Sequence, residues 1–315
     1  PVRHHAPATP HLVTTYDAVL RNAAAAERLR PEVVLCLGGW PTSKVLRAWI
    51  AASEAPIWLV SDRADNRDAL HGRTRHVASS LASFVAGLPV STDDNGYTRM
   101  WLRYEQRTRD ALDARLAATA ELFEPKAAWL LARHLPVGTP VCVANSMPAR
   151  DVEYVWPAGD CAIEPHFNRG ANGIDGTLST ALGVAHAAGR PAVLLTGDLA
   201  LLHDSNGFLL REKFRGSLTV VLINNRGGGI FEHLPVAQFD PPFEGFFATP
   251  QDVDFATLCA AHRVEHTRVR DWTHFTELVT TLPATGIRVI EVATDRKRDA
   301  ARRKELFAEL AAGLG

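Results

Sequence analysis

Near-continuous apolar runs recur through the second half of this 315-residue chain. The clearest are PAVLLTGD (191–198), LTVVLINN (218–225) and IRVIEVA (287–293), and longer amphipathic stretches separate them. A strand that is apolar at nearly every position is typical of a parallel sheet with helices on both faces. The runs therefore predict the α/β class and, more narrowly, a doubly wound parallel sheet.

The first half repeats this alternation on a smaller scale. EVVLCLGG (32–39) and PIWLVSD (56–62) read as strands, and TSKVLRAWIAAS (42–53) between them reads as a helix. A polar, turn-rich stretch, STDDNGY (91–97), then interrupts the pattern. We therefore predict two domains: part of a smaller Rossmann-like domain over residues 1–92 and the doubly wound domain over residues 93–315.

The remaining elements of the second domain follow from the same periodicities. Its last segment, DRKRDAARRKELFAEL (295–310), is basic on one helical face and apolar on another, which predicts a solvated amphipathic helix. The other predicted strands are 141–145 and 161–167, and the other predicted helices are 98–123, 126–134, 178–188, 199–214, 255–262 and 273–282.

Charge and hydropathy exclude several classes of protein. The formal net charge of −1 argues against nucleic acid as a partner, because phosphate binding requires a basic excess. No apolar run approaches the roughly 18 residues of a membrane span, and the first ten residues, PVRHHAPATP, lack the apolar core of a signal peptide. We expect a cytoplasmic protein without a membrane span. The four cysteines are scattered without a CxxC and are predicted to be buried thiols: Cys36, Cys142, Cys161 and Cys259.

Polar side chains follow two apolar strands of the second domain. Asp198 closes the first strand and Asn225 closes the second, with a helix between them. Carboxylate, amide and carbonyl oxygens suit Mg2+, which takes about six oxygen ligands. The glycines at 227–229 are expected to let the backbone approach both a metal and a diphosphate. The alternative is structural: Asp198 as a helix N-cap and Asn225 in a turn.

The segment GDLALLHDSNGFLLREKFRGSLTVVLINN (197–225) resembles the diphosphate-binding motif of thiamine-diphosphate-dependent enzymes, with Leu199 at the usual third glycine. Three loops narrow the resemblance: NSMPARDVE (145–153), NRGANGIDGTLSTALGVA (168–185) and NNRGGGIFEHLP (224–235). They resemble the MenD family of menaquinone biosynthesis, the 2-succinyl-5-enolpyruvyl-6-hydroxy-3-cyclohexene-1-carboxylate synthases. The likeness continues through residues 249–262 and weakly back to residues 37–49.

The resemblance implies a site for thiamine diphosphate with Mg2+ or Mn2+. It implies that the metal ligands are Asp198, Asn225 and the carbonyl of Gly227. Ile174 would be the wedge that bends the cofactor. The other implied cofactor contacts are Gly170, Ala171, Asn172, Gly197, Leu199, Gly228 and Ile230, with Ile230, Phe231 and Leu234 on the apolar side of the site. Asn145, Ser146, Arg150 and Arg169 would face the substrates.

The implied reaction joins 2-oxoglutarate to isochorismate after decarboxylation. Both substrates are dianions, so arginines on strand-end loops make sense as bidentate carboxylate partners. A structural salt bridge is the alternative for Arg150 and for Arg169. Lys44 matches a basic position of the family's middle domain, but Val45 stands where some members carry arginine, which puts a substrate contact from this segment in doubt.

The family chemistry also needs a glutamate from a pyrimidine-binding domain, which these residues do not resemble. We expect the chain to be a C-terminal portion of a longer or split enzyme that catalyses little alone and works as a homodimer or homotetramer. Two alternatives stay open: another thiamine-diphosphate carboligase or decarboxylase related to acetolactate synthase, and a non-catalytic binding subunit. A nucleotide-binding dehydrogenase fits least, because LCLGGWPTS (35–43) lacks GxGxxG.

Overall fold

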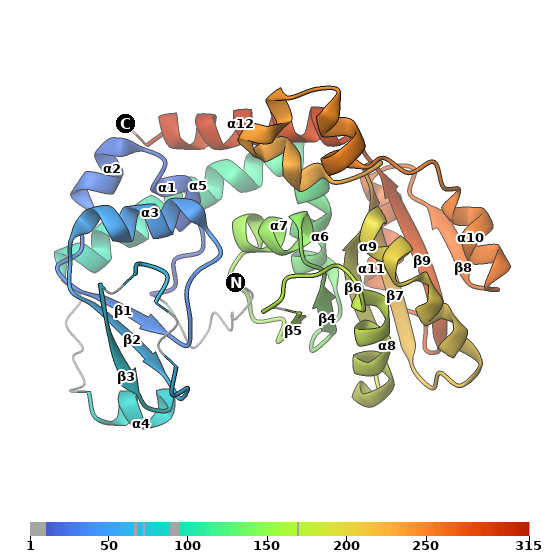
Figure 1. The fold of residues 1–315 in the computed structure, drawn as a ribbon, viewed down its shortest axis with the longest axis horizontal. Helices are drawn as coiled ribbons and strands as arrows, with labels where there is room; N and C mark the ends of the chain where they lie inside the picture. Colours follow the sequence, from blue (N-terminus) through green and yellow to red (C-terminus); the bar gives the residue numbers. More distant parts are fainter. Residues whose placement is uncertain (1–10, 66–67, 72, 89–94, 169, 315) are drawn as a thin grey trace. The chain divides into compact units, whose positions relative to one another are not determined.

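The computed structural model describes residues 11–65, 68–71, 73–88, 95–168 and 170–314 (Figure 1). By compactness these residues form two units. The large unit comprises the described part of Pro1–Thr14 together with Leu112–Leu306, and the small unit comprises Thr15–Ala111 with the described part of Phe307–Gly315. The predicted division at residues 92 and 93 lies outside the described residues. The compact units divide inside helix α5 (Gly96–Ala118) and inside helix α12 (Arg296–Ala312).

A six-stranded parallel sheet forms the large unit, in the order β5-β4-β6-β7-β9-β8. From β4 the chain moves outward to β5 and then crosses to β6 on the other side, so the winding direction reverses between β4 and β6. Ligands of doubly wound sheets bind at such a reversal, outside the carboxyl ends of the strands. The strands are β4 (Pro140–Val143), β5 (Glu164–Phe167), β6 (Ala192–Gly197), β7 (Ser217–Asn224), β8 (Glu265–Arg268) and β9 (Gly286–Ala293).

Both faces of this sheet are buried, as the apolar runs predict. One face packs on helix α8, whose Leu178 and Leu182 lie in one cluster with Leu194 and Val220 of the central strands. Alternate strand residues such as Val193 are buried on the other face, where α7 packs against β6. The helices are α6 (Glu124–His134), α7 (Met147–Val155), α8 (Thr177–Ala188), α9 (Asp198–His203), α10 (Phe255–Ala261) and α11 (Trp272–Thr280).

Between β7 and α10 the chain makes short turns of other helix types instead of a regular helix. They are 3-10 helices at Gly229–His233 and Pro235–Gln238 and a π-helical turn at Glu244–Ala248. Backbone hydrogen bonds hold these turns, among them Phe231 N–H to the Gly228 carbonyl and Thr249 N–H to the Glu244 carbonyl. Short π-helical turns are frequent at functional sites.

The small unit has a three-stranded parallel sheet, β1 (Val34–Leu37), β2 (Ile57–Ser61) and β3 (Thr74–Ala78), in that order. Leu46 and Ile50 of α3 (Lys44–Ser53) pack on it. Ser43 caps α3 by accepting a hydrogen bond from the Leu46 N–H, and Lys44 is exposed in the first turn. Its other helices are α1 (Tyr16–Val19), α2 (Ala23–Arg28) and α4 (Leu81–Ala86).

Several sequence expectations need correction. The single helix predicted over 199–214 is two pieces, α9 and a 3-10 helix at Ser205–Glu212. Asp204 separates them, because its carboxylate accepts from both the backbone and the hydroxyl of Ser179. Strands β3 and β8 and helix α7 were not foreseen. Polar edge strands such as TRHVA and EHTR lack the apolar pattern of buried strands.

The basic C-terminal helix is not simply solvated. Within α12, Arg303 and Asp299 are buried, and Arg296 pairs with Glu232 and Glu244. Three of the cysteines are buried as predicted, whereas Cys161 is half-buried. Across the described residues, no helix combines the length and the apolar composition that spanning a membrane requires.

Candidate cofactor and metal site

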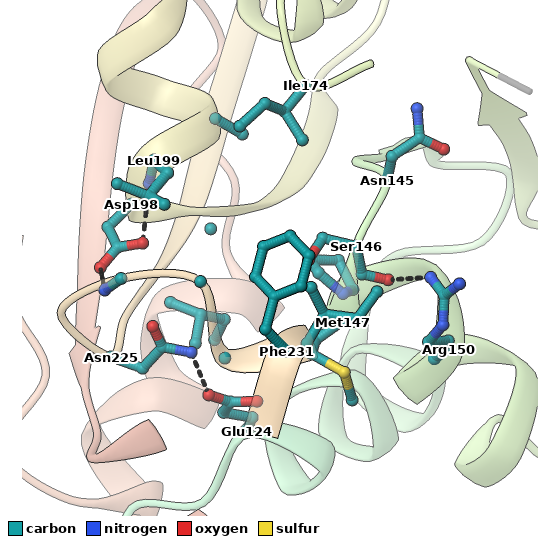
Figure 2. Close-up of a pocket in the computed structure, with 18 of the residues that line it drawn as sticks. Glu124, Asn145, Ser146, Met147, Arg150, Ile174, Asp198, Leu199, Asn225 and Phe231 are labelled. Carbon is teal, nitrogen blue, oxygen red and sulfur yellow. Dashed lines mark hydrogen bonds between the residues drawn. The ribbon is translucent and has the colours of Figure 1, made fainter. Parts of the chain in front are cut away.

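A cavity of about 420 Å3 opens at the carboxyl ends of β4, β6 and β7 (Figure 2). It lies where the winding direction of the sheet reverses, so the topology accounts for its position. Thirteen of the predicted site residues line it. They are Asn145, Ser146, Arg150, Asn172, Ile174, Gly197, Asp198, Leu199, Asn225, Gly227, Gly228, Ile230 and Phe231.

Asp198 is the first residue of α9, directly after β6, and is buried at 4% exposure. Its two carboxylate oxygens accept from the N–H groups of Leu199, at 2.7 Å, and Gly227, at 2.8 Å. Burial raises the pKa of Asp198 to about 6, although both of these N–H donors favour the charged form. A cation beside this carboxylate would restore its charged form.

Asn225 follows β7 on the neighbouring strand and is also buried. Its amide nitrogen donates to Glu124 Oε1 at 2.5 Å. Its Oδ1 is buried and has no hydrogen-bond partner among the described residues. A buried carbonyl-type oxygen without a partner costs about 1–3 kcal/mol unless a ligand, water or ion satisfies it. This oxygen and the Asp198 carboxylate fit the donor set of a hard cation.

The glycines at 227 and 228 are required by contacts within the chain itself, and their expected approach to a metal and a diphosphate stays a prediction. A side chain at Gly227 would overlap the carbonyl oxygen of Ala248, and one at Gly228 would come within 2.7 Å of the Phe247 carbonyl oxygen. The Gly228 N–H donates to the Ala248 carbonyl at 2.7 Å, and Gly227 has φ of 133°. The chain's own backbone therefore makes the close approach that requires these glycines.

The Gly227 carbonyl, the third predicted ligand, accepts from the Gly229 N–H at 2.9 Å. A carbonyl oxygen has two lone pairs, so this bond leaves it able to accept a second interaction.

The opposite wall of the cavity begins at the end of β4. Asn145 is buried and donates its amide to the backbone carbonyls of Asn168, at 2.7 Å, and Gly173, at 2.6 Å. It therefore holds the following glycine-rich loop in place. Ser146 has φ of 71°, a left-handed conformation that is uncommon for residues other than glycine. The half-buried Arg150 on α7 donates to the Ser146 carbonyl at 2.7 Å.

Only some of the contact residues predicted in the loop at 168–176 line the cavity. Asn172 and Ile174 line the cavity, and Ile174 points into it from its upper side (Figure 2). Gly170 and Ala171 are exposed and are not among the lining residues. Arg169 lies outside the described residues, so its predicted role stays a prediction.

An apolar group completes the cavity. Ile230, Phe231 and Met147 all line it (Figure 2). The Phe231 ring also packs edge-on against Phe247 at 5.7 Å between centroids. Leu234 is half-buried in the following turn and does not line the cavity.

Most of the residues that line the cavity lie in a segment that matches a known protein family. Residues 164–292 match the family described as thiamine pyrophosphate enzyme, C-terminal TPP binding domain. This part of the chain belongs to that family. The cavity residues of the β6 and β7 ends fall inside this thiamine pyrophosphate domain, whereas Glu124 and the α7 residues precede it. The predicted resemblance and the predicted α/β fold are confirmed.

Relatives match over nearly the whole chain. A protein from Gloeothece citriformis, named 2-succinyl-5-enolpyruvyl-6-hydroxy-3-cyclohexene-1-carboxylate synthase, is 49% identical over 95% of this chain and 52% of its own length. Proteins of the same name from Trichormus variabilis and Synechococcus sp. are 49% and 50% identical over 99% and 98% of the chain. These matches cover 54% and 51% of those relatives. The chain spans about half the length of the curated relatives it matches.

Next to Asn225 lies a buried ionic cluster that the sequence did not reveal. Arg303 Nη2 donates to Glu124 Oε2 at 3.0 Å and to Asp151 Oδ1 at 2.7 Å. Burial raises the pKa of Asp151 and raises that of Asp299 to about 7. Burial opposes the charge of Arg303, but the Asp151 and Glu124 carboxylates raise its pKa above the usual value, so it stays charged.

The sequence did not single out seven of the lining residues. Only Pro148 had a local signal, because it stands in the first turn of α7, where proline is favoured. The seven residues are Glu124, Met147, Pro148, Asp151, Gly173, Ala200 and Ile223.

Proposed function

We propose that this chain carries the diphosphate-binding and metal-binding half of a thiamine-diphosphate-dependent synthase of menaquinone biosynthesis. The proposed reaction decarboxylates 2-oxoglutarate and adds the remaining four-carbon unit to isochorismate. The observation that supports it best is the convergence of Asp198 and the unpartnered Asn225 Oδ1 at one cavity in a thiamine pyrophosphate domain. The names of relatives that match 95–99% of the chain favour this synthase over other carboligases.

In this proposal Asp198, Asn225 and the Gly227 carbonyl hold Mg2+ or Mn2+, which in turn binds the diphosphate. Bound thiamine diphosphate supplies a carbanion and accepts electrons during decarboxylation. Gly197, Leu199, Gly228 and Asn172 offer backbone and side-chain contacts to the cofactor, with Gly170 and Ala171 at the loop edge.

Ile174 and Ile230 shape the apolar part of the cavity, with Phe231 and, more distantly, Leu234. Excluding water there strengthens every polar contact in the site. Arg150 and Ser146 are proposed to bind substrate carboxylates, with Arg169 as a second cation and Asn145 as the residue that orders its loop. Two dianionic substrates need such donors beside an anionic cofactor.

A pyrimidine-binding region is proposed to complete the site, either from further sequence of the polypeptide or from another chain, in a homodimer or homotetramer. We expect the enzyme to act in the cytoplasm.

The test compares two oxo acids. The full-length natural polypeptide is incubated with thiamine diphosphate, Mg2+ and isochorismate, with either 2-oxoglutarate or pyruvate, and the products are identified by mass spectrometry. We expect a succinyl adduct and CO2 from 2-oxoglutarate only. Preferential use of pyruvate would favour an acetolactate-synthase-like carboligase. Calorimetry that detects no Mg2+-dependent binding of thiamine diphosphate would favour a non-catalytic subunit.

A further inference from the structure

Glu124 lies in the cavity wall but has no place in the proposed chemistry. It is the first residue of α6, far from Asn225 in sequence, and is buried at 3% exposure. One carboxylate oxygen accepts from the Asn225 amide and the other accepts from Arg303. Figure 2 shows the nitrogen of Asn225 turned toward Glu124 and the oxygen turned away from it.

We propose that Glu124 is a positioning residue that fixes the orientation of the Asn225 carboxamide, so that its oxygen faces the metal. This inference rests on the proposed function, since it concerns how the proposed metal ligand is presented. A carboxamide has two nearly isosteric ends, and only its hydrogen-bond partners decide which end faces the cavity. An ionised carboxylate only accepts hydrogen bonds, so Glu124 must receive the NH2 end.

Two further contacts make this arrangement specific. A side chain on Gly229 would come within 2.7 Å of Asn225 Nδ2, so the backbone there closes the space beside the amide. Arg303 is charged and donates to Glu124 Oε2, so the carboxylate cannot turn away without leaving a buried guanidinium with one partner fewer. The Asn225 Oδ1 that results has no partner among the residues described.

The decisive variant is Glu124→Gln, which keeps the size of the side chain. The buried Arg303 donates only, so the glutamine must turn its carbonyl oxygen toward Arg303 and its NH2 toward Asn225. Asn225 then has to accept, which presents its own NH2 to the metal. We expect the affinity for Mn2+, at saturating thiamine diphosphate, to fall about 10–100-fold, the range typical of groups that orient metal ligands.

A second substitution should reverse this loss. In the double variant Glu124→Gln with Asn225→Asp, the carboxylate at position 225 accepts from the glutamine with one oxygen and offers the other to the metal. We expect Mn2+ affinity to return to within a few-fold of the wild type, about 5-fold or less. Asn225→Asp alone places two carboxylates in contact and should weaken binding. A purely structural role for Glu124 predicts no such recovery.

The measurement is electron paramagnetic resonance of free Mn2+ during titration of the full-length polypeptide with thiamine diphosphate, alongside melting temperatures without metal or cofactor. Asp299→Asn is the matched control, because Asp299 accepts from the Glu124 N–H at 3.1 Å and is equally buried. The Asn225 amide bonds to Glu124 and not to Asp299. We expect it to change the melting temperature without the affinity loss.

The outcomes separate the two proposals. Wild-type protein that binds no Mn2+ with thiamine diphosphate would overturn the proposed function and this inference with it. Wild-type binding that Glu124→Gln leaves unchanged, or losses in the double variant that simply add, would overturn the inference alone. Loss in Glu124→Gln with recovery in the double variant supports it.

Discussion

The two walls of the cavity are built in opposite ways. The anchored wall, Asp198, Asn225 and Gly227 at the ends of β6 and β7, is buried, and hydrogen bonds fix each of its side chains. The loop wall, Ser146, Arg150 and residues 172–174, is half-buried or exposed. Asn145 ties that loop to the end of β4 through two backbone carbonyls.

From this difference we infer that the two walls have different roles. Groups on buried, central strands keep their positions without a ligand, which suits the binding of a metal and a diphosphate that do not change during turnover. Groups on a loop and on the first turn of α7 can adjust to substrates that enter and leave. We therefore expect variants of the anchored wall to affect cofactor binding and variants of the loop wall to affect substrate use.

The largest expected effect comes from Asp198→Asn, which keeps the shape of the anchored wall but removes its charge. We expect affinity for thiamine diphosphate in the presence of Mg2+ to fall more than about 100-fold, beyond the effect of groups that only support a metal ligand. Isothermal titration of the full-length polypeptide measures it. Asp252→Asn, on an exposed residue outside the cavity, is the control. Unchanged affinity in Asp198→Asn would show that the anchored wall does not hold the cofactor.

Gly227→Ala should come next, because it moves the loop that carries the third proposed ligand. The left-handed backbone and the overlap with the Ala248 carbonyl are each expected to destabilise the folded state, by roughly 1–3 kcal/mol for the backbone term alone. We expect a lower melting temperature and weaker cofactor binding. Gly245→Ala is the matched control from the same segment between β7 and α10, since a side chain there meets nothing within 4 Å. Equal melting temperatures for the two variants would refute this account of the glycines.

The sequence predicts most of the sheet, for a physical reason. Strands β6, β7 and β9 are buried on both faces, so their apolar runs mark them within about a residue. Strands β3 and β8 pair at one edge only and carry polar residues, so no pattern marks them. The helix predicted over 199–214 is interrupted because a tertiary hydrogen bond from Ser179 to Asp204 outweighs local periodicity.

The candidate site divides in the same way. Asp198, Asn225 and Gly227 follow predictable strands, so their convergence is expected from topology and from the family motif. Glu124 could not be found, since its bond to Asn225 joins residues 101 positions apart and neither has a local signal for the other. The left-handed backbone of Ser146 could not be predicted either, because nothing in the segment NSMPAR indicates a positive φ at the serine. The roles of all these residues stay predictions until binding is measured.

On the loop wall, Arg150→Ala should affect substrates and leave the cofactor bound. Charge-assisted hydrogen bonds contribute about 1.5–3 kcal/mol, so we expect kcat/KM for the affected substrate to fall roughly 10–100-fold. Arg150→Lys keeps the charge but loses the bidentate geometry and should recover only part of it. Steady-state kinetics with each substrate varied in turn identifies which one Arg150 contacts. A parallel loss of thiamine diphosphate affinity would show that the loop wall also binds the cofactor.

Ile174→Val should have a smaller effect than the other variants and tests whether the loop wall binds the cofactor or only shapes it. Ile174 is half-buried and lines the cavity from the loop wall, whereas the groups proposed to anchor the diphosphate belong to the anchored wall. Ile174→Val removes one methyl group, a change typically worth about 0.5–1.5 kcal/mol where the side chain is packed. If Ile174 only shapes the bound cofactor, we expect its affinity to change less than about 3-fold while kcat falls by more, because a misplaced reactive centre loses rate before it loses binding. Calorimetry and single-turnover kinetics on the same preparation separate the two quantities, and Ile174→Leu, which conserves volume, is the control. A loss of affinity comparable to that of Asp198→Asn would instead make the loop wall an anchor in its own right.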